Sequence, residues 1–233
     1  MKIYFKYNFF IFFCVFFVAC KQNQERPGGY QGGSTPLDNK DKSSAKFNDL
    51  IADYESRDRL IWQKPDMIIN RLGDLSTQTV ADLGAGTGFF AFRIVQKAKK
   101  VIALDIDQRF ISLMDSSKQE LSPELRAKFE ARLVDVDDAK LKKGETNAVI
   151  IVNTYMYIQS RVDYMKKLRM GIAKGGKVLI VDYKEKNIPV GPPVSIKLPL
   201  SLVEKELKQA GFKQINSDDT SLDYQYIITA INE

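Results

Sequence analysis

Short apolar runs alternate with amphipathic stretches along most of the chain. The runs at 80–83, 101–104 and 148–152 are almost purely apolar, as is typical of parallel strands covered on both faces of a sheet. The stretches at 108–117 and 161–173 carry apolar residues at helical spacing. Strands that alternate with helices predict an α/β domain built on a mostly parallel sheet.

The remaining elements complete this pattern towards the C-terminus. Gly175 and Gly176 follow the helical stretch and predict its end. The last two strands are separated by a polar turn and predict an antiparallel hairpin. The other helices are expected at 66–72, 123–129 and 201–210, and the other strands at 131–134, 177–181, 213–217 and 224–231.

The first apolar run leads into a glycine-rich segment, Asp82-Leu83-Gly84-Ala85-Gly86-Thr87-Gly88. Alternate glycines allow the backbone to curl tightly and to approach a ligand closely. The second strand ends at Asp105, where a carboxylate can meet ribose hydroxyls. Phe89 stands where a dinucleotide fingerprint has its last glycine, and Asp82 would repel a diphosphate. The pattern therefore predicts an adenosine-bearing cofactor with a cationic portion.

These residues resemble motif I of the class I S-adenosylmethionine-dependent methyltransferases, D-x-G-x-G-x-G, matched at Asp82, Gly84, Gly86 and Gly88. The resemblance covers about residues 54–231 and implies a seven-stranded Rossmann-like sheet in the order 3-2-1-4-5-7-6, flanked by helices. It implies S-adenosylmethionine as cofactor, at the carboxyl ends of strands one, two and four. The implied reaction is methyl transfer to a nucleophilic O, N or S atom of an unidentified acceptor.

The resemblance also implies which positions bind the cofactor. Either Asp137 or Asp138 would approach the adenine amino group, and a solvated acidic turn is the alternative for each. The full set of implied cofactor contacts is Asp82, Gly84, Ala85, Gly86, Thr87, Gly88, Asp105, Ile106, Asp137, Asp138 and Asn153.

Catalytic positions follow from the same resemblance. Asn153 and Tyr155, after the fourth strand, would frame the methyl group and the acceptor. Relatives often carry histidines just beyond this point, whereas this chain has Met156 and Tyr157. Asp182 or a tyrosine would then serve as general base.

An upstream segment is expected to cover the site. Arg59, Trp62, Gln63 and Pro65 precede the helix at 66–72, which we expect to pack across the cofactor mouth. Trp62 could equally be a core residue.

The N-terminus has a different character. Lys2 and Lys6 precede the apolar run 9–19, which is shorter than the roughly 20 residues of a membrane span. Cys20 follows it and resembles the lipidated cysteine of a bacterial lipoprotein. We therefore expect a signal peptide at 1–19, a lipidated cysteine and flexible tether at 20–45, and the methyltransferase domain at 46–233. The alternatives are an uncleaved signal anchor and a cysteine that falls at this position by chance.

Composition narrows the chemistry. The chain has no histidine, which excludes a Ser-His-Asp triad, a histidine base and histidine-containing zinc sites, and no metal is expected. The net charge of +6 comes from dispersed lysines and arginines, so a nucleic-acid partner is not expected. Cys14 would leave with the signal peptide, so Cys20 would have no disulfide partner.

Location and cofactor are in conflict. A lipoprotein domain faces the periplasm or the cell surface, whereas S-adenosylmethionine is made in the cytoplasm. An unused signal would keep the domain in the cytoplasm. A lipid-tethered protein that binds a small ligand on this fold without turnover is the alternative function.

Overall fold

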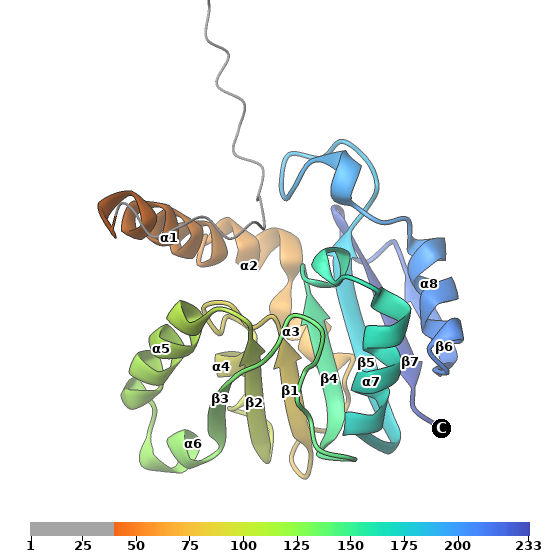
Figure 1. Ribbon diagram of the computed structural model, residues 1–233, viewed down its shortest axis with the longest axis horizontal. Coiled ribbons are helices and arrows are strands. Elements are labelled where there is room, and N and C mark those ends of the chain that lie inside the picture. Colours follow the sequence, from red (N-terminus) through yellow and green to blue (C-terminus); the bar gives the residue numbers. More distant parts are fainter. Residues whose placement is uncertain (1–39) are drawn as a thin grey trace, which may run out of the picture. The chain divides into compact units, whose positions relative to one another are not determined.

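The computed structural model describes residues 40–233, with side chains from Lys46 onward. The expected signal peptide, Cys20 and most of the expected tether lie outside the described residues. One seven-stranded sheet organises the described part, and its strand order β3-β2-β1-β4-β5-β7-β6 confirms the predicted topology (Figure 1). Within this part no helix is long and apolar enough to cross a membrane.

The sheet is parallel except at one edge. Neighbouring strands from β3 to β5 run parallel, whereas β7 pairs antiparallel with both β5 and β6. The predicted C-terminal hairpin is thereby confirmed. The strands are β1 Thr79–Leu83, β2 Lys100–Asp105, β3 Phe129–Leu133, β4 Thr146–Val152, β5 Ile172–Tyr183, β6 Lys213–Asp218 and β7 Gln225–Ile231.

Helices occupy the connections between strands, and α1 and α2 lie across one end of the sheet (Figure 1). Helix α1 begins at Lys40, within the segment assigned to the tether. The helices are α1 Lys40–Tyr54, α2 Asp58–Gln63, α3 Pro65–Asn70, α4 Ala91–Ile94, α5 Gln108–Ser117, α6 Pro123–Ala127, α7 Arg161–Gly171 and α8 Leu200–Gln209, with single 3-10 turns η1 Lys118–Glu120, η2 Tyr155–Tyr157 and η3 Val194–Ile196.

Strand β5 starts earlier than predicted and includes the two glycines expected to end the preceding helix. The N–H of Gly175 donates to the carbonyl of Asn232 at 2.6 Å, and the N–H of Asn232 donates to the carbonyl of Gly176 at 2.8 Å. A Cβ at Gly176 would lie 2.6 Å from the carbonyl oxygen of Asn147 on β4. Gly176 therefore serves a close backbone approach near the start of the strand, whereas a Cβ at Gly175 would meet nothing within 4 Å.

Alternate residues of β1, β2, β4, β5 and β7 pack into two separate apolar clusters. Val181 of β5 belongs to the cluster that contains Ile69 of α3, which we call the α3 face. Ile180 belongs to the cluster that contains Leu207 of α8, which we call the α8 face. Because side chains alternate along a strand, this pattern decides which face each residue at the strand ends approaches.

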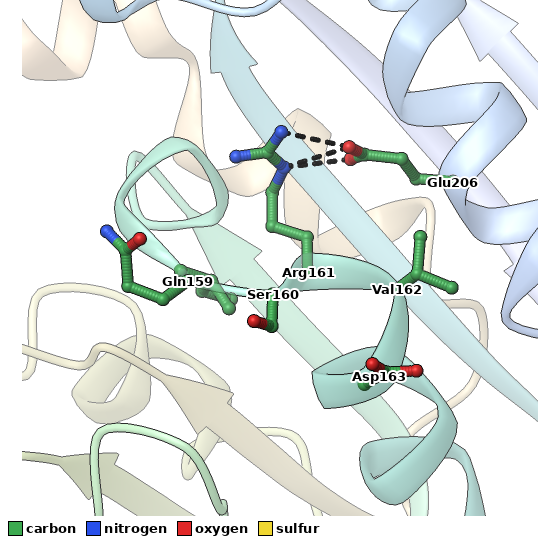
Figure 2. A pocket seen from close by; sticks show the side chains of 7 residues that line it. Gln159, Ser160, Arg161, Val162, Asp163 and Glu206 are labelled. Carbon is green, nitrogen blue, oxygen red and sulfur yellow. Dashed lines mark hydrogen bonds and ion pairs between the residues drawn. The ribbon is translucent and has the colours of Figure 1, made fainter.

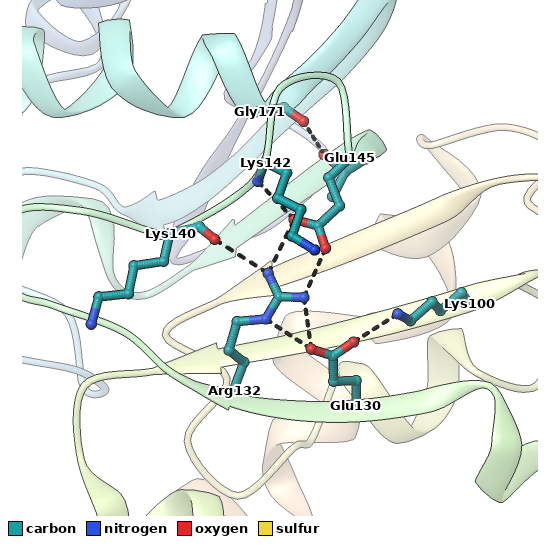
Figure 3. Close-up of polar contacts among 8 residues, drawn as sticks. Lys100, Glu130, Arg132, Lys140, Lys142, Glu145 and Gly171 are labelled. Carbon is teal, nitrogen blue, oxygen red and sulfur yellow. Dashed lines mark hydrogen bonds and ion pairs between the residues drawn. The ribbon is translucent and has the colours of Figure 1, made fainter.

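A network of charges joins β2, β3 and the turn before β4. Arg132 of β3 lies 2.7 Å from Glu145 and 2.6 Å from Glu130, and Glu130 lies 2.7 Å from Lys100 of β2 (Figure 3). The bonds from Arg132 lower the pKa of Glu145 to about 2. These contacts brace the edge of the sheet and do not involve the glycine-rich loop.

Candidate functional site

The loop between β1 and α4 is the centre of the candidate site. The N–H groups of Gly84 and Ala85 donate to the carbonyl of Leu104 at 2.8 and 3.0 Å, which fixes the loop to the end of β2. Gly84 has a φ of +74°, and a Cβ there would lie 2.4 Å from Oγ1 of Thr154. The loop thus packs directly against the segment that follows β4, as the expected site requires.

Asp82 lies beneath this loop with an unused hydrogen-bonding atom. Asp82 is 3% exposed, and among residues 40–233 its Oδ2 has no hydrogen-bond partner. Burial raises the pKa of Asp82 to about 7, although the N–H of Ala91 and the nearby Arg59 guanidinium favour the charged form. A buried carboxylate oxygen without a partner is costly unless a donor or cation completes it.

Asp105 ends β2 beside the loop. Its Oδ2 accepts the N–H of Gly86 at 2.8 Å, and its Oδ1 accepts the N–H of Asp107 at 2.9 Å. Burial raises the pKa of Asp105, and these N–H bonds oppose the shift. Because each carboxylate oxygen can accept a further bond, both atoms can still receive hydroxyl donors.

An apolar surface continues from Asp105. Ile106 is 55% exposed. The N–H of Val134 donates to the carbonyl of Asp105 at 3.0 Å and so brings the loop after β3 alongside. Val136 in that loop is 61% exposed, and sequence reasoning missed it. An apolar residue within the acidic run 135–138 was the available signal.

The two acidic residues expected near adenine make other contacts. Asp138 accepts the N–H of Lys140 at 2.7 Å. Asp137 is exposed, and its Oδ2 lies 3.5 Å from Nζ of Lys167 on α7. These contacts match the solvated acidic turn, the alternative stated for both residues.

Residues at the end of α1 cover the loop. A Cβ at Gly86 would lie 3.1 Å from the Tyr54 ring, and that ring stacks on Phe110 at 5.7 Å between centroids. Thr87 donates its hydroxyl to Glu55 at 2.5 Å. Neither Tyr54 nor Glu55 was predicted from the sequence.

The cover differs from the expected one. The helix expected across the mouth, α3, instead buries Ile68 and Ile69 in the core of the α3 face. Because the apolar side chains of α3 pack in the core, this helix does not cover the glycine-rich loop. Residues of α1 and α2 cover it instead.

Arg59 of α2 lies at the junction of cover and loop. It is 8% exposed, and its guanidinium carbon lies 4.1 Å from the Phe89 ring centroid. Its Nη1 donates to the carbonyl of Tyr54 at 2.7 Å. Burial lowers the pKa of Arg59, while Tyr183, Glu55 and Asp82 favour its charge. A cation thus packs on Phe89, the residue that stands at the last glycine position of the dinucleotide fingerprint.

Asn153, directly after β4, has a φ of +57°. Its Oδ1 accepts an amide N–H from Gln225 and lies 3.5 Å from Nε2 of Gln63. Gln63 and Gln225 are both fully buried. Asn153 is therefore next to the loop, as expected, and is held there by residues of α2 and β7.

Tyr155 is placed differently from its expected position beside the methyl group. It is fully buried in the cluster of the α8 face, and its hydroxyl donates to Oε2 of Glu206 at 2.8 Å. Glu206 of α8 also accepts three bonds from the guanidinium of Arg161, the first residue of α7 (Figure 2). Since no surface of Tyr155 is exposed, an acceptor cannot reach it.

Asp182 also departs from its expected role as base. It continues the alternation of β5 on the α8 face, where its Oδ2 accepts the N–H of Met156 at 3.1 Å. Its Oδ1 accepts the N–H of Tyr183 at 2.9 Å. Burial raises the pKa of Asp182 to about 7. The carboxylate holds the η2 turn against β5 and is a positioning residue.

Trp62 and Tyr224 directly precede Gln63 and Gln225 in the chain, and Tyr183 pairs with Gln225 across β5 and β7. We call Trp62, Tyr183 and Tyr224 the aromatic wall. Ring centroids of Trp62 lie 6.1 Å from Tyr183 and 6.3 Å from Tyr224. Trp62 is half-buried and is not part of either core cluster. Sequence reasoning missed Tyr183, although its place one residue after Asp182 puts it on the opposite, α3 face.

No cluster of metal-ligating side chains occurs among the described residues. The group that best fits the loop is instead an organic cation with a ribose, because Oδ2 of Asp82 lacks a partner within the described part of the chain and Asp105 retains acceptor capacity.

The chain is similar to known methyltransferases over most of the described residues. The profile of a methyltransferase domain family matches residues 74–229. The chain is 25% identical over 147 residues to a tRNA U34 carboxymethyltransferase of Actinobacillus succinogenes, covering 60% of this chain and 44% of that protein. It is 23% identical over 162 residues to a demethylmenaquinone methyltransferase of Lactococcus lactis, covering 65% and 62%. The chain thus spans less than two thirds of these curated relatives.

A solved structure shares the fold. A SAM-dependent methyltransferase from Aquifex aeolicus matches with a TM-score of 0.73 at 18% identity, covering 81% of this chain and 98% of that one.

Proposed function

Since the chain belongs to the methyltransferase domain family, we propose that it binds S-adenosylmethionine on the loop from Gly84 to Gly88 and transfers the methyl group to an acceptor O, N or S atom. The observation that carries the proposal is Oδ2 of buried Asp82, which no described residue donates to. The cationic amino group of the cofactor would donate a hydrogen bond to this oxygen. A dinucleotide would instead bring phosphate charge towards this carboxylate.

Other residues fit the remaining parts of the cofactor. Asp105 would accept bonds from the ribose hydroxyls, and exposed Ile106 would pack on adenine. Arg59, whose guanidinium lies near Asp82, would pair with the cofactor carboxylate. The bound cofactor supplies an electrophilic methyl group on a sulfonium sulfur.

The chain's own contribution is orientation and exclusion of water. Methyl transfer depends chiefly on bringing the acceptor atom into line with the methyl group. Tyr54 and Glu55 cover the loop, and Asn153 lies at the acceptor side. Neither Tyr155 nor Asp182 reaches this space, so they are not part of the proposed catalytic set.

Binding of S-adenosylmethionine is expected to tighten as pH rises through about 7. The unliganded pKa of Asp82 is about 7, and a cationic ligand binds the carboxylate form. Below that pH one proton must leave on binding, so affinity falls by up to about tenfold per pH unit. Calorimetric titration of the full chain between about pH 5.5 and 8.5 measures the slope.

The variant Asp82→Asn serves as the control for this slope, because it has no proton to lose. It should bind more weakly at high pH and with little pH dependence. Asp182 also has a pKa of about 7 and could cause a similar pH dependence of binding. If the pH dependence persists in Asp82→Asn, it arises from another group, and the proposed contact between Asp82 and the cofactor is contradicted.

The proposal includes an envelope location, with the chain anchored by a lipid on Cys20. Its support is the N-terminal sequence alone, in which a basic start and the apolar run 9–19 precede the cysteine. Wild-type protein is expected to incorporate labelled fatty acid and to fractionate with membranes, and Cys20→Ala should lose the label. Cys14→Ala is the matched control and should keep it. Absence of label in the wild type, together with protection from protease added to spheroplasts, would overturn the envelope location.

A further inference from the structure

Four polar side chains form a continuous hydrogen-bonded series from the cover to the acceptor side of the loop. Nε of Arg59 donates to Oε1 of Gln63 at 2.5 Å. Nε2 of Gln63 donates to Oε1 of Gln225 at 3.0 Å, and Nε2 of Gln225 donates to Oδ1 of Asn153. We call these residues the amide series. It connects α2, β7 and the end of β4, which are far apart in sequence.

Arg59 determines the direction of every bond in the amide series. A guanidinium can only donate hydrogen bonds, so Gln63 must present its oxygen to Arg59 and its NH2 group to Gln225. Gln225 must then present its oxygen to Gln63 and its NH2 group to Asn153. The orientation of each amide therefore follows from its partners and does not rest on an arbitrary choice between oxygen and nitrogen.

The series leaves Asn153 with its donor end available. Its Oδ1 receives bonds from Gln225 and, at 3.5 Å, from Gln63. Within the described part of the chain Nδ2 of Asn153 has no protein partner, and the side chain is only half-buried. The next residue, Thr154, is the one that a Cβ at Gly84 would strike. Asn153 thus presents N–H groups beside the cofactor loop.

An N–H donor at this place discriminates between acceptor atoms. A neutral amine has a single lone pair, and a bond from Asn153 would occupy the pair needed to attack the methyl carbon. A hydroxyl or phenolate oxygen has further lone pairs, so it can accept the N–H bond and still attack. The bond is stronger to the oxyanion than to the neutral hydroxyl, which favours the reactive form.

The side chains beside Asn153 offer planar partners, and the Tyr183 phenol among them is not a base. Burial raises the pKa of Tyr183 above its ordinary value, so this phenol remains protonated and does not remove protons. Trp62 and Tyr224 of the aromatic wall are both half-buried and offer ring surface to a planar molecule. An acceptor that ionises in water before it binds needs no protein base.

We propose that the acceptor is a planar molecule with an acidic, phenol- or enol-type hydroxyl, held by Nδ2 of Asn153 against the aromatic wall. This inference rests on the methyltransferase function proposed above. The hydroxyl loses its proton to solvent, and the oxyanion attacks the methyl carbon. The O–CH3 bond forms as the S–CH3 bond breaks, and S-adenosylhomocysteine leaves with the electron pair on sulfur.

Two probes of the same size test the acceptor class, para-cyanophenol and para-cyanoaniline. Trp62 is the single tryptophan of the chain, so its fluorescence reports binding at the aromatic wall. The full chain, saturated with S-adenosylhomocysteine at mildly alkaline pH, is titrated with each probe. We expect the phenol to bind at least about tenfold more tightly than the aniline. With S-adenosylmethionine instead, mass spectrometry should detect the O-methyl ether.

The variant Asn153→Asp keeps the acceptor oxygen for Gln225 and Gln63 but replaces the free donor by a carboxylate oxygen. It should erase the preference for the phenol. Asn147→Asp makes the same change at the other end of β4, where the side-chain oxygen accepts the N–H of Thr79, and should keep the preference.

Failure of this inference is separable from failure of the proposed function. If the wild type does not bind S-adenosylhomocysteine, the proposed methyltransferase function is overturned. Retained binding of S-adenosylhomocysteine overturns only the acceptor class in any of three cases: equal or reversed affinity for the probes, binding of neither probe, or methylation of the aniline nitrogen.

Discussion

Replacing Gly86 by valine is expected to abolish binding of S-adenosylmethionine while the domain remains folded. Gly86 has a φ of +55°, which a β-branched residue adopts only under strain. Its Cβ would also lie 3.1 Å from the Tyr54 ring, on the covered side of the loop. Because Tyr54 belongs to α1 and not to the sheet core, the ring can shift. We expect affinity to fall by on the order of 100-fold or more, with a destabilisation of about 1–2 kcal/mol.

Gly73→Val is the matched control for this variant. Gly73 has a φ of +90°, and a Cβ added there would meet nothing within 4 Å, so valine brings backbone strain without a contact near the loop. Both variants should lower the thermal midpoint, and only Gly86→Val should lose the cofactor in a calorimetric titration. Normal binding by Gly86→Val would show that the loop is a structural turn and would remove the basis of the proposed function.

The sheet could be predicted because its strands carry their own signal. Runs such as 148–152 are short and apolar without interruption, as is typical of a strand covered on both faces. The signal for the loop was also local, because Asp82 and the glycines lie within one short segment. Features determined by neighbouring residues were therefore predicted well.

Residues on the acceptor side could not be predicted in the same way. Asp182 and Tyr183 are adjacent, and only the alternation of a defined strand shows that the first faces α8 and the second faces α3. Gln225 reaches Asn153 because β7 pairs antiparallel with β5, in a register that places Tyr183 opposite Gln225. Such contacts depend on long-range pairing, which one sequence does not specify.

The cover shows a similar limit. Helix α1 carries Tyr54 over the loop, and neither this helix nor its place as a cover was predicted. Helical spacing was weak there, and the helix depends on contacts such as that between Phe47 and Phe110, 5.0 Å apart. Tertiary packing therefore overrides local preference at this end of the domain.

Asp105→Asn is expected to weaken binding of S-adenosylmethionine by roughly 10- to 150-fold, because hydrogen bonds to a charged group contribute about 1.5–3 kcal/mol. Both oxygens of Asp105 already accept backbone N–H groups, from Gly86 and Asp107. The amide retains the shape of the carboxylate but supplies one acceptor oxygen instead of two. Fewer acceptors then remain for the ribose hydroxyls, and calorimetry of the full chain measures the loss.

A second ligand separates ribose contacts from damage to the loop. An S-adenosylhomocysteine analogue without ribose hydroxyls should bind the wild type more weakly than the parent compound, and Asp105→Asn should add little to that loss, because the two changes remove the same interaction. Asp107→Asn is the matched control, since Asp107 caps α5 by accepting the N–H of Arg109 and asparagine caps equally well. Losses that simply add for ligand and variant would show that Asp105 supports the loop through Gly86 and does not contact the ribose.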